Sequence, residues 1–281
     1  MKPTSLNPDE LAYPFLRVGN YRAQRPRTMG MTCVIDGMDS GFLSIAQVEA
    51  LADFAAPYID FVKLGWLIPR FTSRKTLLSK IEQYHKLGIR VFTGGGAMQA
   101  ALIQGKAAEF IEASKRYGVD AMEVGTTIAH ISPRAAVDAL RRIKDAGLLA
   151  FLEIGRKGVA ADPTVDDVRR HLDRLMSAGG DFLIVESERI DSMDRAGTVD
   201  AFLEGCAELG LERLIFELPY GLHLPALQPF ATRLFASLGP DANVANVEFA
   251  HVMGIATIRT GTCFGDLFGR VSTDILPPSG K

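Results

Sequence analysis

Five glycines recur along the chain where a helix-like segment gives way to an apolar run. They are Gly88, Gly118, Gly147, Gly179 and Gly210, and the runs that follow begin IRVF, VDAMEV, LLAFLEI, DFLIV and LERLIF. Their spacing of roughly 30 residues is the length of one β-strand, one helix and two short loops. Because glycine readily takes the left-handed conformation that ends many helices, each glycine predicts a turn from a helix back into a sheet.

Eight apolar runs fit this scheme as strands. In chain order they read GMTCVID, YIDFVKLG, IRVFTGG, DAMEVG, LLAFLEIG, DFLIVES, RLIFELP and the short ANVAN. Runs rich in Val, Ile and Leu are typical of parallel strands that are covered on both faces. Eight strand–helix units in about 250 residues predict an α/β fold with a single (β/α)8 TIM barrel, in preference to a doubly wound sheet.

The barrel is expected to span residues 30–271. Residues 1–29 form an N-terminal extension that carries Pro3, Pro8, Pro14 and Pro26, and residues 272–281 form a C-terminal tail that contains PPSGK. We expect these irregular ends to cover an end of the barrel or a subunit contact, which fits a homo-oligomer.

Two of the expected helices carry clear start signals. Ser132 is a natural N-cap with Pro133 at the first helical position, and Thr164 is followed three residues later by Asp167. A last helix is expected in ATIRTGTCFGDLFGR, after the eighth strand.

Composition excludes several classes of function. The chain has 281 residues, of which 47% are hydrophobic, and a formal net charge of −2 with basic and acidic residues interleaved, which gives no electrostatic case for nucleic acid or for an anionic membrane. Its first 30 residues lack the apolar centre of a signal peptide, so we expect a cytoplasmic protein. Three cysteines at spacings unlike those of metal sites, Cys33, Cys206 and Cys263, are expected to be reduced thiols.

Charged and polar residues gather where the expected strands end. In chain order they are Asp36, Lys63, Gly94 to Gly96, Glu123, Glu153 with Arg156 and Lys157, Glu186, Glu217, Asn243 and Asn246. In a (β/α)8 barrel the carboxyl ends of the strands converge on one mouth, where active sites of this fold lie. We therefore expect these residues to form the functional site.

The chemistry of this set favours carboxylates that share cations. A carboxylate buried alone would take up a proton, so the glutamates need Lys63, Arg156, Lys157 or a divalent metal close by. Oxygen ligands favour Mg²⁺ over zinc, and the alternative is that some of these charges form ion pairs that only hold the barrel together. The glycines after the third strand either let backbone N–H groups approach an anion or form a tight turn.

A lysine beside acidic residues and Mg²⁺ suits enolate chemistry. A Schiff-base lysine, as in an aldolase-type barrel, is the second possibility, but it requires a neutral amine without close carboxylates.

The motifs as a set resemble one known family. DFVKLGW, VFTGGG, AMEVG, FLEIGRK, LIFELP, ANVANV and the closing FGDLFGR resemble, in order and spacing, the phosphosulfolactate synthase (ComA-like) family. The resemblance covers residues 30–271, and the family also includes plant heat-stress-associated 32-kDa proteins. It implies a (β/α)8 barrel and a lyase that adds sulfite to phosphoenolpyruvate with Mg²⁺, giving (2R)-phosphosulfolactate for coenzyme M biosynthesis.

The resemblance also implies roles for individual residues. Lys157 corresponds to the lysine that would protonate C2 of the enediolate. Lys63, Glu123, Glu153, Glu186, Glu217, Asn243 and Asn246 also fall on family positions. Together with the chemistry of the strand ends, this gives Lys157, Lys63 and Glu123 as the expected catalytic residues, Gly94, Gly95, Arg156, Arg189, Asn243 and Asn246 as the expected residues for anionic substrates, and Glu153, Glu186 and Glu217 as the expected metal ligands.

The sequence departs from the family pattern at five places, the first being KLGWLIP at residues 63–69, where the family has KFGWGTS. Gln99 replaces a glutamate, Thr126 replaces an aspartate, Arg189 is displaced by one position, and Cys263 stands where the family has a cation. Since arginine and serine groups usually bind phosphate and sulfonate, another small nucleophile or a non-catalytic, stress-related family member are the alternatives.

Overall fold

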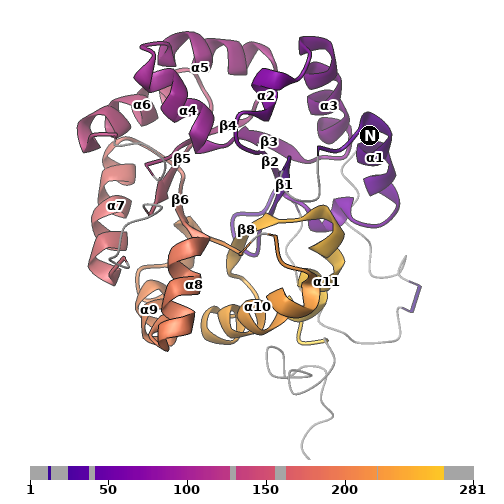
Figure 1. Cartoon of the computed structure of the whole chain (residues 1–281), viewed down its shortest axis with the longest axis vertical. Helices are drawn as coiled ribbons and strands as arrows, with labels where there is room; N and C mark the ends of the chain where they lie inside the picture. Colours follow the sequence, from indigo (N-terminus) through magenta and orange to yellow (C-terminus); the bar gives the residue numbers. More distant parts are fainter. Residues whose placement is uncertain are drawn as a thin grey trace, which may run out of the picture.

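The eight apolar runs form eight parallel strands that close into a barrel in chain order (Figure 1). The computed structural model describes residues 12–13, 25–37, 42–126, 131–155, 163–219 and 221–262, without the side chains of residues 187–189 and 191. The strands are β1 Thr32–Asp36, β2 Phe61–Leu64, β3 Arg90–Thr93, β4 Ala121–Val124, β5 Leu149–Ile154, β6 Phe182–Val185, β7 Leu214–Glu217 and β8 Asn243–Val247. The predicted fold class, a (β/α)8 TIM barrel, is therefore confirmed.

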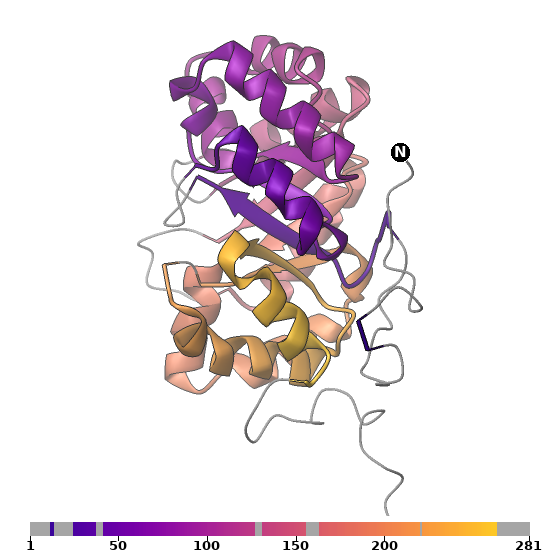
Figure 2. The same ribbon diagram turned by 90° about the vertical axis from the view of Figure 1, so that its right-hand side faces the viewer.

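Helices surround the strands on the outside, as the side view also shows (Figure 2). They are α1 Ile45–Ala50, α2 Ile68–Phe71, α3 Arg74–Lys86, α4 Gly95–Ile103, α5 Ala107–Arg116, α6 Pro133–Asp145, α7 Val165–Ser177, α8 Ser187–Ala196, α9 Val199–Ala207, α10 Leu224–Leu238 and α11 Val252–Arg259, with short 3₁₀ turns η2 Leu51–Asp53, η3 Ala56–Tyr58, η4 Leu211–Arg213 and η5 Phe249–His251. The last helix, α11, begins earlier than the sequence predicted, and residues 263–270 of that prediction lie outside the described residues.

The glycines and caps behave as the sequence predicted. The five recurring glycines all have positive φ, between 68° and 92°, which is the left-handed region that lets a helix end and the chain turn into the next strand. The Ser132 side chain accepts a hydrogen bond from Ala135 N at the start of α6, and Thr164 and Asp167 form a capping box at the start of α7.

The barrel interior is filled by aromatic rings. Four of them, Phe61, Phe92, Phe151 and Phe182, contact one another edge to face with ring centroids 5.2–6.0 Å apart. We call these four residues the phenylalanine floor, because Lys63 and Glu153 of the mouth follow Phe61 and Phe151 by two residues on the same strands. A separate and larger apolar layer fills the space between the strands and the helices.

Three aspartates, each placed directly before an even-numbered strand, bind the preceding odd-numbered strand. Asp60 accepts a hydrogen bond from Thr32 N, Asp120 from Val91 N, and Asp181 from Ala150 N, at 2.7–2.9 Å. Each aspartate also contacts a cationic or ionisable side chain: Arg27, His85 and Lys144, respectively. We call these the base aspartates, since they lie at the amino ends of the strands, opposite the mouth.

The ends of the chain are only partly described. Arg25 and Arg27 hold residues 25–31 against the base of the barrel: Arg25 donates to the carbonyls of Ile59 and Gly88, and Arg27 pairs with Asp60. The proposed boundaries of the two extensions stay predictions. None of the helices among the described residues is long and apolar enough to cross a membrane.

Candidate active site

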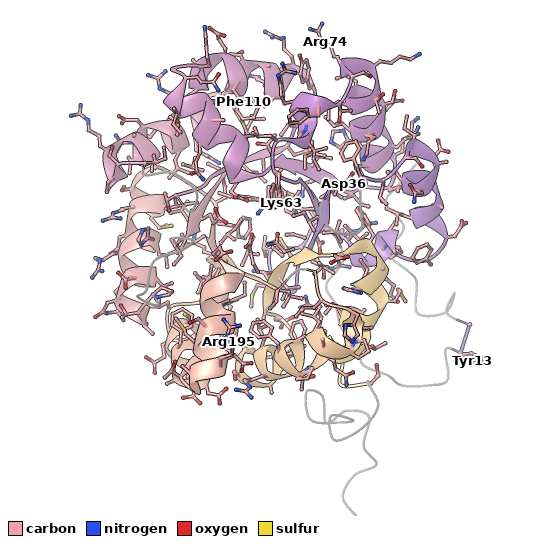
Figure 3. The ribbon with its side chains drawn as sticks, in the orientation of Figure 1. Tyr13, Asp36, Lys63, Arg74, Phe110 and Arg195 are labelled. Carbon is pink, nitrogen blue, oxygen red and sulfur yellow. The ribbon has the colours of Figure 1, made fainter. Side chains whose placement is uncertain are left out.

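Lys63 lies at the centre of the mouth, near the barrel axis (Figure 3). It follows Phe61 by two residues on β2, so the alternation of side chains along a strand brings it into the barrel interior, above the phenylalanine floor. Its Nζ lies 2.9 Å from Glu123 Oε2 and 2.8 Å from Glu217 Oε1, and all three side chains are buried. One ammonium on β2 thus binds carboxylates from β4 and β7, across the barrel.

This environment fixes the charge of Lys63. Burial acts to lower its pKa, but the carboxylates of Glu123, Glu217 and Glu153 outweigh burial and hold the pKa of Lys63 well above its usual value. The amine is therefore protonated across the physiological range. A Schiff base needs a neutral amine, so the aldolase-type alternative finds no support at Lys63.

The backbone at the start of α4 binds the second carboxylate oxygen of Glu123. Gly94 is the N-cap of α4 and its N–H donates to Leu64 O, while Gly95 N donates to Glu123 Oε1 at 2.8 Å. A Cβ on Gly95 would lie 2.5 Å from that oxygen and 2.6 Å from Gly125 Cα. The predicted approach of backbone N–H groups to an anion does occur, but the anion that Gly95 binds in this structure is the protein's own carboxylate.

Glu153 and Glu186 complete the acidic side of the mouth. Both are buried, with relative exposures of 6% and 1%. Burial raises the pKa of Glu153 well above its ordinary value, and the neighbouring carboxylates of Glu123 and Glu217 raise it further, while Lys63 acts in the opposite direction. Four glutamates therefore share this mouth with Lys63.

Two further glycines, each at the end of a strand, make this crowding possible. A Cβ on Gly125 would lie 2.6 Å from Gln99 Nε2 and 2.9 Å from Glu153 Oε2, and a Cβ on Gly155 would lie 2.7 Å from Glu186 Cβ. The signal was present in the sequence as a glycine two residues after a strand glutamate, in EVG and again in EIG.

Two predicted positions at the mouth are wrong. Asp36 ends β1, but by alternation from Cys33 it faces the helices; it contacts Lys80 Nζ and Tyr84 Oη, both at 2.6 Å, under α3. Asn243 is the first residue of β8 and not near its end. Its amide accepts from Met31 N and donates to the carbonyls of Leu211 and Leu214, so it belongs to the base of the barrel.

Asn246 is at the carboxyl end of β8 as predicted, and it is buried with a φ of 56°. Four other predictions fall outside what the structure describes: Arg156, Lys157 and Cys263 are beyond the described residues, and only the backbone of Arg189, in α8, is described. Of the other departures, Gln99 is buried on α4, and the Thr126 hydroxyl donates to Glu153 O at 3.1 Å.

The donor atoms of the mouth meet part of what a metal site requires. In the described part of the chain, no three His, Cys, Asp or Glu side chains converge closely enough to hold a metal. The donor chemistry nevertheless fits Mg²⁺: carboxylate oxygens outnumber the described cation, and the buried Asn246 Oδ1 receives no hydrogen bond from the described residues. Of the expected metal ligands Glu153, Glu186 and Glu217, Glu217 also binds Lys63 through its Oε1.

A family model and the related sequences that match this chain carry the same description. The family model for (2R)-phospho-3-sulfolactate synthase (ComA) matches residues 20–265. A phosphosulfolactate synthase of Methanocaldococcus jannaschii is 31% identical over 251 residues, covering 86% of this chain and 95% of the relative. One of Bacillus subtilis is 26% identical over 250 residues, covering 85% and 93%.

Solved structures show the same barrel. 3-Hexulose-6-phosphate synthase from Salmonella typhimurium superposes with a TM-score of 0.51 at 15% identity, covering 83% of this chain and all of that one. The carboxyl transferase domain of Rhizobium etli pyruvate carboxylase gives 0.59 at 11% identity, covering 87% of this chain and 46% of that one. These likenesses show the fold, whereas the family match spans nearly the whole barrel with its charged mouth: the chain belongs to the (2R)-phospho-3-sulfolactate synthase (ComA) family.

Proposed function

We propose that the protein is a phosphosulfolactate synthase-like lyase that joins sulfite, or a related small nucleophile, to phosphoenolpyruvate. The observation that carries the proposal is the cluster of four glutamates around Lys63 at the mouth of a barrel of this family. Small anionic molecules are the proposed partners. Assembly as a homo-oligomer, the lack of a nucleic-acid or membrane partner and a cytoplasmic location stay predictions from the sequence.

The proposed reaction forms one carbon–sulfur bond. The sulfur lone pair of sulfite attacks C3 of phosphoenolpyruvate, and the C2–C3 π pair moves into the carboxylate as an enediolate. A proton delivered to C2 then gives (2R)-phosphosulfolactate, with the phosphate ester retained. A bound Mg²⁺, for which Glu153, Glu186 and Glu217 are the proposed ligands, would supply positive charge for the developing dianion.

The described residues contribute a fixed charge and a dry environment. Lys63 stays protonated and cannot accept a proton at neutral pH, so its role is electrostatic: it supplies positive charge that needs no reorganisation during the reaction. Glu123, bound by Lys63 and Gly95 N, is a carboxylate that holds the ammonium in place. The phenylalanine floor closes the barrel below these groups.

Lys157 is the proposed proton donor, and its replacement tests the proposal. Lys157→Ala should lower turnover by roughly 10²–10⁴, the usual contribution of a positioned acid or base. Lys157→Arg should not restore turnover, because a guanidinium stays protonated near neutral pH. The measurement is the loss of enol absorbance from phosphoenolpyruvate and sulfite, and near-normal turnover of Lys157→Ala would remove the assignment.

Metal removal gives a second prediction. Turnover should be lost in EDTA and restored by added Mg²⁺, because the dianion otherwise develops among carboxylates without a compensating cation. Full turnover in metal-free protein would contradict the metal part of the proposal. Binding of phosphoenolpyruvate without turnover on sulfite would instead indicate a different nucleophile, which the replacements Gln99 and Thr126 favour.

A further inference from the structure

Trp66 has backbone geometry that bulky residues avoid. It is the one tryptophan of the chain, and it lies at the mouth, between the end of β2 and the start of α2. Its φ of 51° lies in the left-handed region, which costs a non-glycine residue about 1–2 kcal/mol. Such residues are uncommon and gather at functional sites, where the strain is part of binding or catalysis.

The side chain of Trp66 contributes little packing to the fold. The residue is 62% exposed, although an indole is among the side chains that bury the most apolar surface. All four residues of the following helix, α2, are half-buried or exposed, so Trp66 does not belong to a packed element. A strained backbone that carries an unburied ring indicates a residue that serves something other than the unliganded fold.

The backbone of Trp66 lies beside the side chain of Lys63. Lys63 Cε is 3.2 Å, and Trp66 N is 3.7 Å, from the position that a Cβ would take on Gly94, so both line the same small space at the start of α4. Gly65 N donates to Asp36 O at 2.9 Å and fixes the turn that leads to Trp66. Because the phenylalanine floor closes the barrel below Lys63, a ligand of Lys63 enters from the side on which Trp66 lies.

An indole offers an anionic ligand two interactions. Its flat face covers a bound molecule and excludes water, which strengthens the attraction between the Lys63 ammonium and an anion. Its Nε1–H is a hydrogen-bond donor and never an acceptor, so it suits an anionic oxygen and not a metal ion. A small phosphorylated acid has both a short carbon skeleton to cover and oxygens that accept.

A protein partner is the other class of occupant that exposed apolar residues at the mouth suggest. Leu67 and Phe71 follow Trp66 with exposures of 41% and 84%. The strain, however, belongs to Trp66 alone of the three, since Leu67 has a φ of −107° and Phe71 ends a helix. Strain and closeness to Lys63 therefore coincide in one residue, which favours a ligand of the mouth.

We propose that Trp66 is a ligand-contacting residue, whose indole covers the small phosphorylated acid bound beside Lys63 and donates its Nε1–H to one of the anionic oxygens. The assignment deepens the proposed function and rests on it for the choice of phosphoenolpyruvate as the probe. It concerns binding of the acid and is independent of the nucleophile that reacts with it.

The wild type carries its own reporter, because its fluorescence comes from a single tryptophan. Phosphoenolpyruvate with Mg²⁺ should shift the emission of Trp66 to shorter wavelength and protect it from quenching by acrylamide, because the ring leaves water. Calorimetry on the same samples gives the Kd independently. A fluorescence change that saturates at the calorimetric Kd supports the assignment, and unchanged emission at saturating ligand overturns it.

Two variants separate the ring from its donor. Trp66→Phe keeps a ring without the Nε1–H, whereas Trp66→Gly removes both and suits the left-handed backbone. Calorimetry should give a Kd for phosphoenolpyruvate about tenfold higher in Trp66→Gly, the usual effect of one lost hydrogen bond, and a smaller rise in Trp66→Phe. Phe71→Ser is the matched control from the same exposed segment and should keep the wild-type Kd.

An unchanged Kd in Trp66→Gly would overturn the assignment and leave the proposed function standing. A raised Kd in Trp66→Gly, together with no turnover of sulfite by the wild type, would uphold Trp66 and contradict the proposed function. If the wild type does not bind phosphoenolpyruvate, both are overturned. An emission shift that follows protein concentration instead of ligand concentration would mean that a protein partner covers Trp66, which also overturns the assignment.

Discussion

The buried ammonium of Lys63 forms ion pairs with two glutamates of the mouth and lies near a third, Glu153. Lys63 is bonded to Glu123 and Glu217, whereas Glu153 lies beside the same group with a raised pKa, the chief cause being burial. Breaking a buried pair by removing one partner is far more disruptive than losing an exposed pair. The mouth is therefore held together by the same ammonium that gives it positive charge.

Glu153→Gln should stabilise the metal-free protein, and more so as pH rises. Because the folded-state pKa of Glu153 is raised, the wild type loses stability as pH increases from the unfolded pKa, about 4.3, through the folded one. In EDTA, Tm should rise by about 2–4 °C at pH 8, the shift that about 1 kcal/mol produces in a domain of this size, and the difference should shrink toward pH 5.

Glu109→Gln on α5 is the matched control, since this carboxylate is exposed and pairs with the exposed Lys106. Its Tm should stay within about 1 °C of the wild type at each pH. A destabilised Glu153→Gln at pH 8 would contradict the expected pKa.

At the scale of elements, the contact between α4 and β4 is set by a glycine. Gly95 begins α4, donates its N–H to Glu123 and lies against the backbone of Gly125. The helix start and the strand end approach each other here without side chains between them. This is why a charged group on β4 and a helix terminus can share one hydrogen bond.

Gly95→Ala should disrupt this contact. The added Cβ would meet a carboxylate oxygen and backbone atoms within 2.7 Å, so α4 must shift, and we expect unfolding free energy to fall by about 1–3 kcal/mol. Gly147→Ala is the control: no atom lies within 4 Å of its Cβ position, so its cost of about 1–2 kcal/mol comes from the left-handed backbone alone. Phosphoenolpyruvate binding should weaken in Gly95→Ala and stay normal in Gly147→Ala; the reverse pattern would contradict the role of Gly95.

The elements also show what the sequence could predict. Strand order, the closing glycines and two helix caps follow from local patterns, and the structure agrees with them. The prediction for Asp36 is wrong because the end of a strand does not by itself tell which way a side chain faces, and the alternation set by Cys33 and Val34 turns Asp36 toward the helices. The prediction for Asn243 is wrong because a short strand gives no sign of where its pairing begins, and the bulge where β8 pairs with β1 leaves no local signature in ANVAN.

At the scale of the whole molecule, the base of the barrel repeats one arrangement of hydrogen bonds. Each base aspartate ties an even strand to the odd strand before it, with Arg27, His85 or Lys144 as its partner. Of these three partners only histidine titrates near neutral pH. One of the three base aspartates therefore has a partner whose charge changes near neutral pH.

His85→Gln should reveal this sensitivity. The hydrogen bond to Asp120 raises the pKa of His85, so its stabilising effect is complete below the unfolded pKa of about 6.5 and is lost as pH rises through the folded value. The wild type should exceed the variant in Tm at pH 6, and the gap should close by pH 9. His85 is 39% exposed, so the effect should stay below about 1 kcal/mol.

Lys144→Gln provides the comparison, because the equivalent pair with Asp181 contains no histidine. Its Tm gap to the wild type should be constant from pH 6 to pH 9. A gap for His85→Gln that grows with pH would show that the histidine binds as a neutral ring.

The phenylalanine floor separates these two charged ends of the barrel. The described ion pairs of the mouth and those of the base have no residue in common, so the effects of substitutions at the two ends on stability should add. A descendant of this chain could thus exchange residues at the mouth one at a time while the base of its barrel stays unaltered, so that a new substrate preference would arise by small, independent steps.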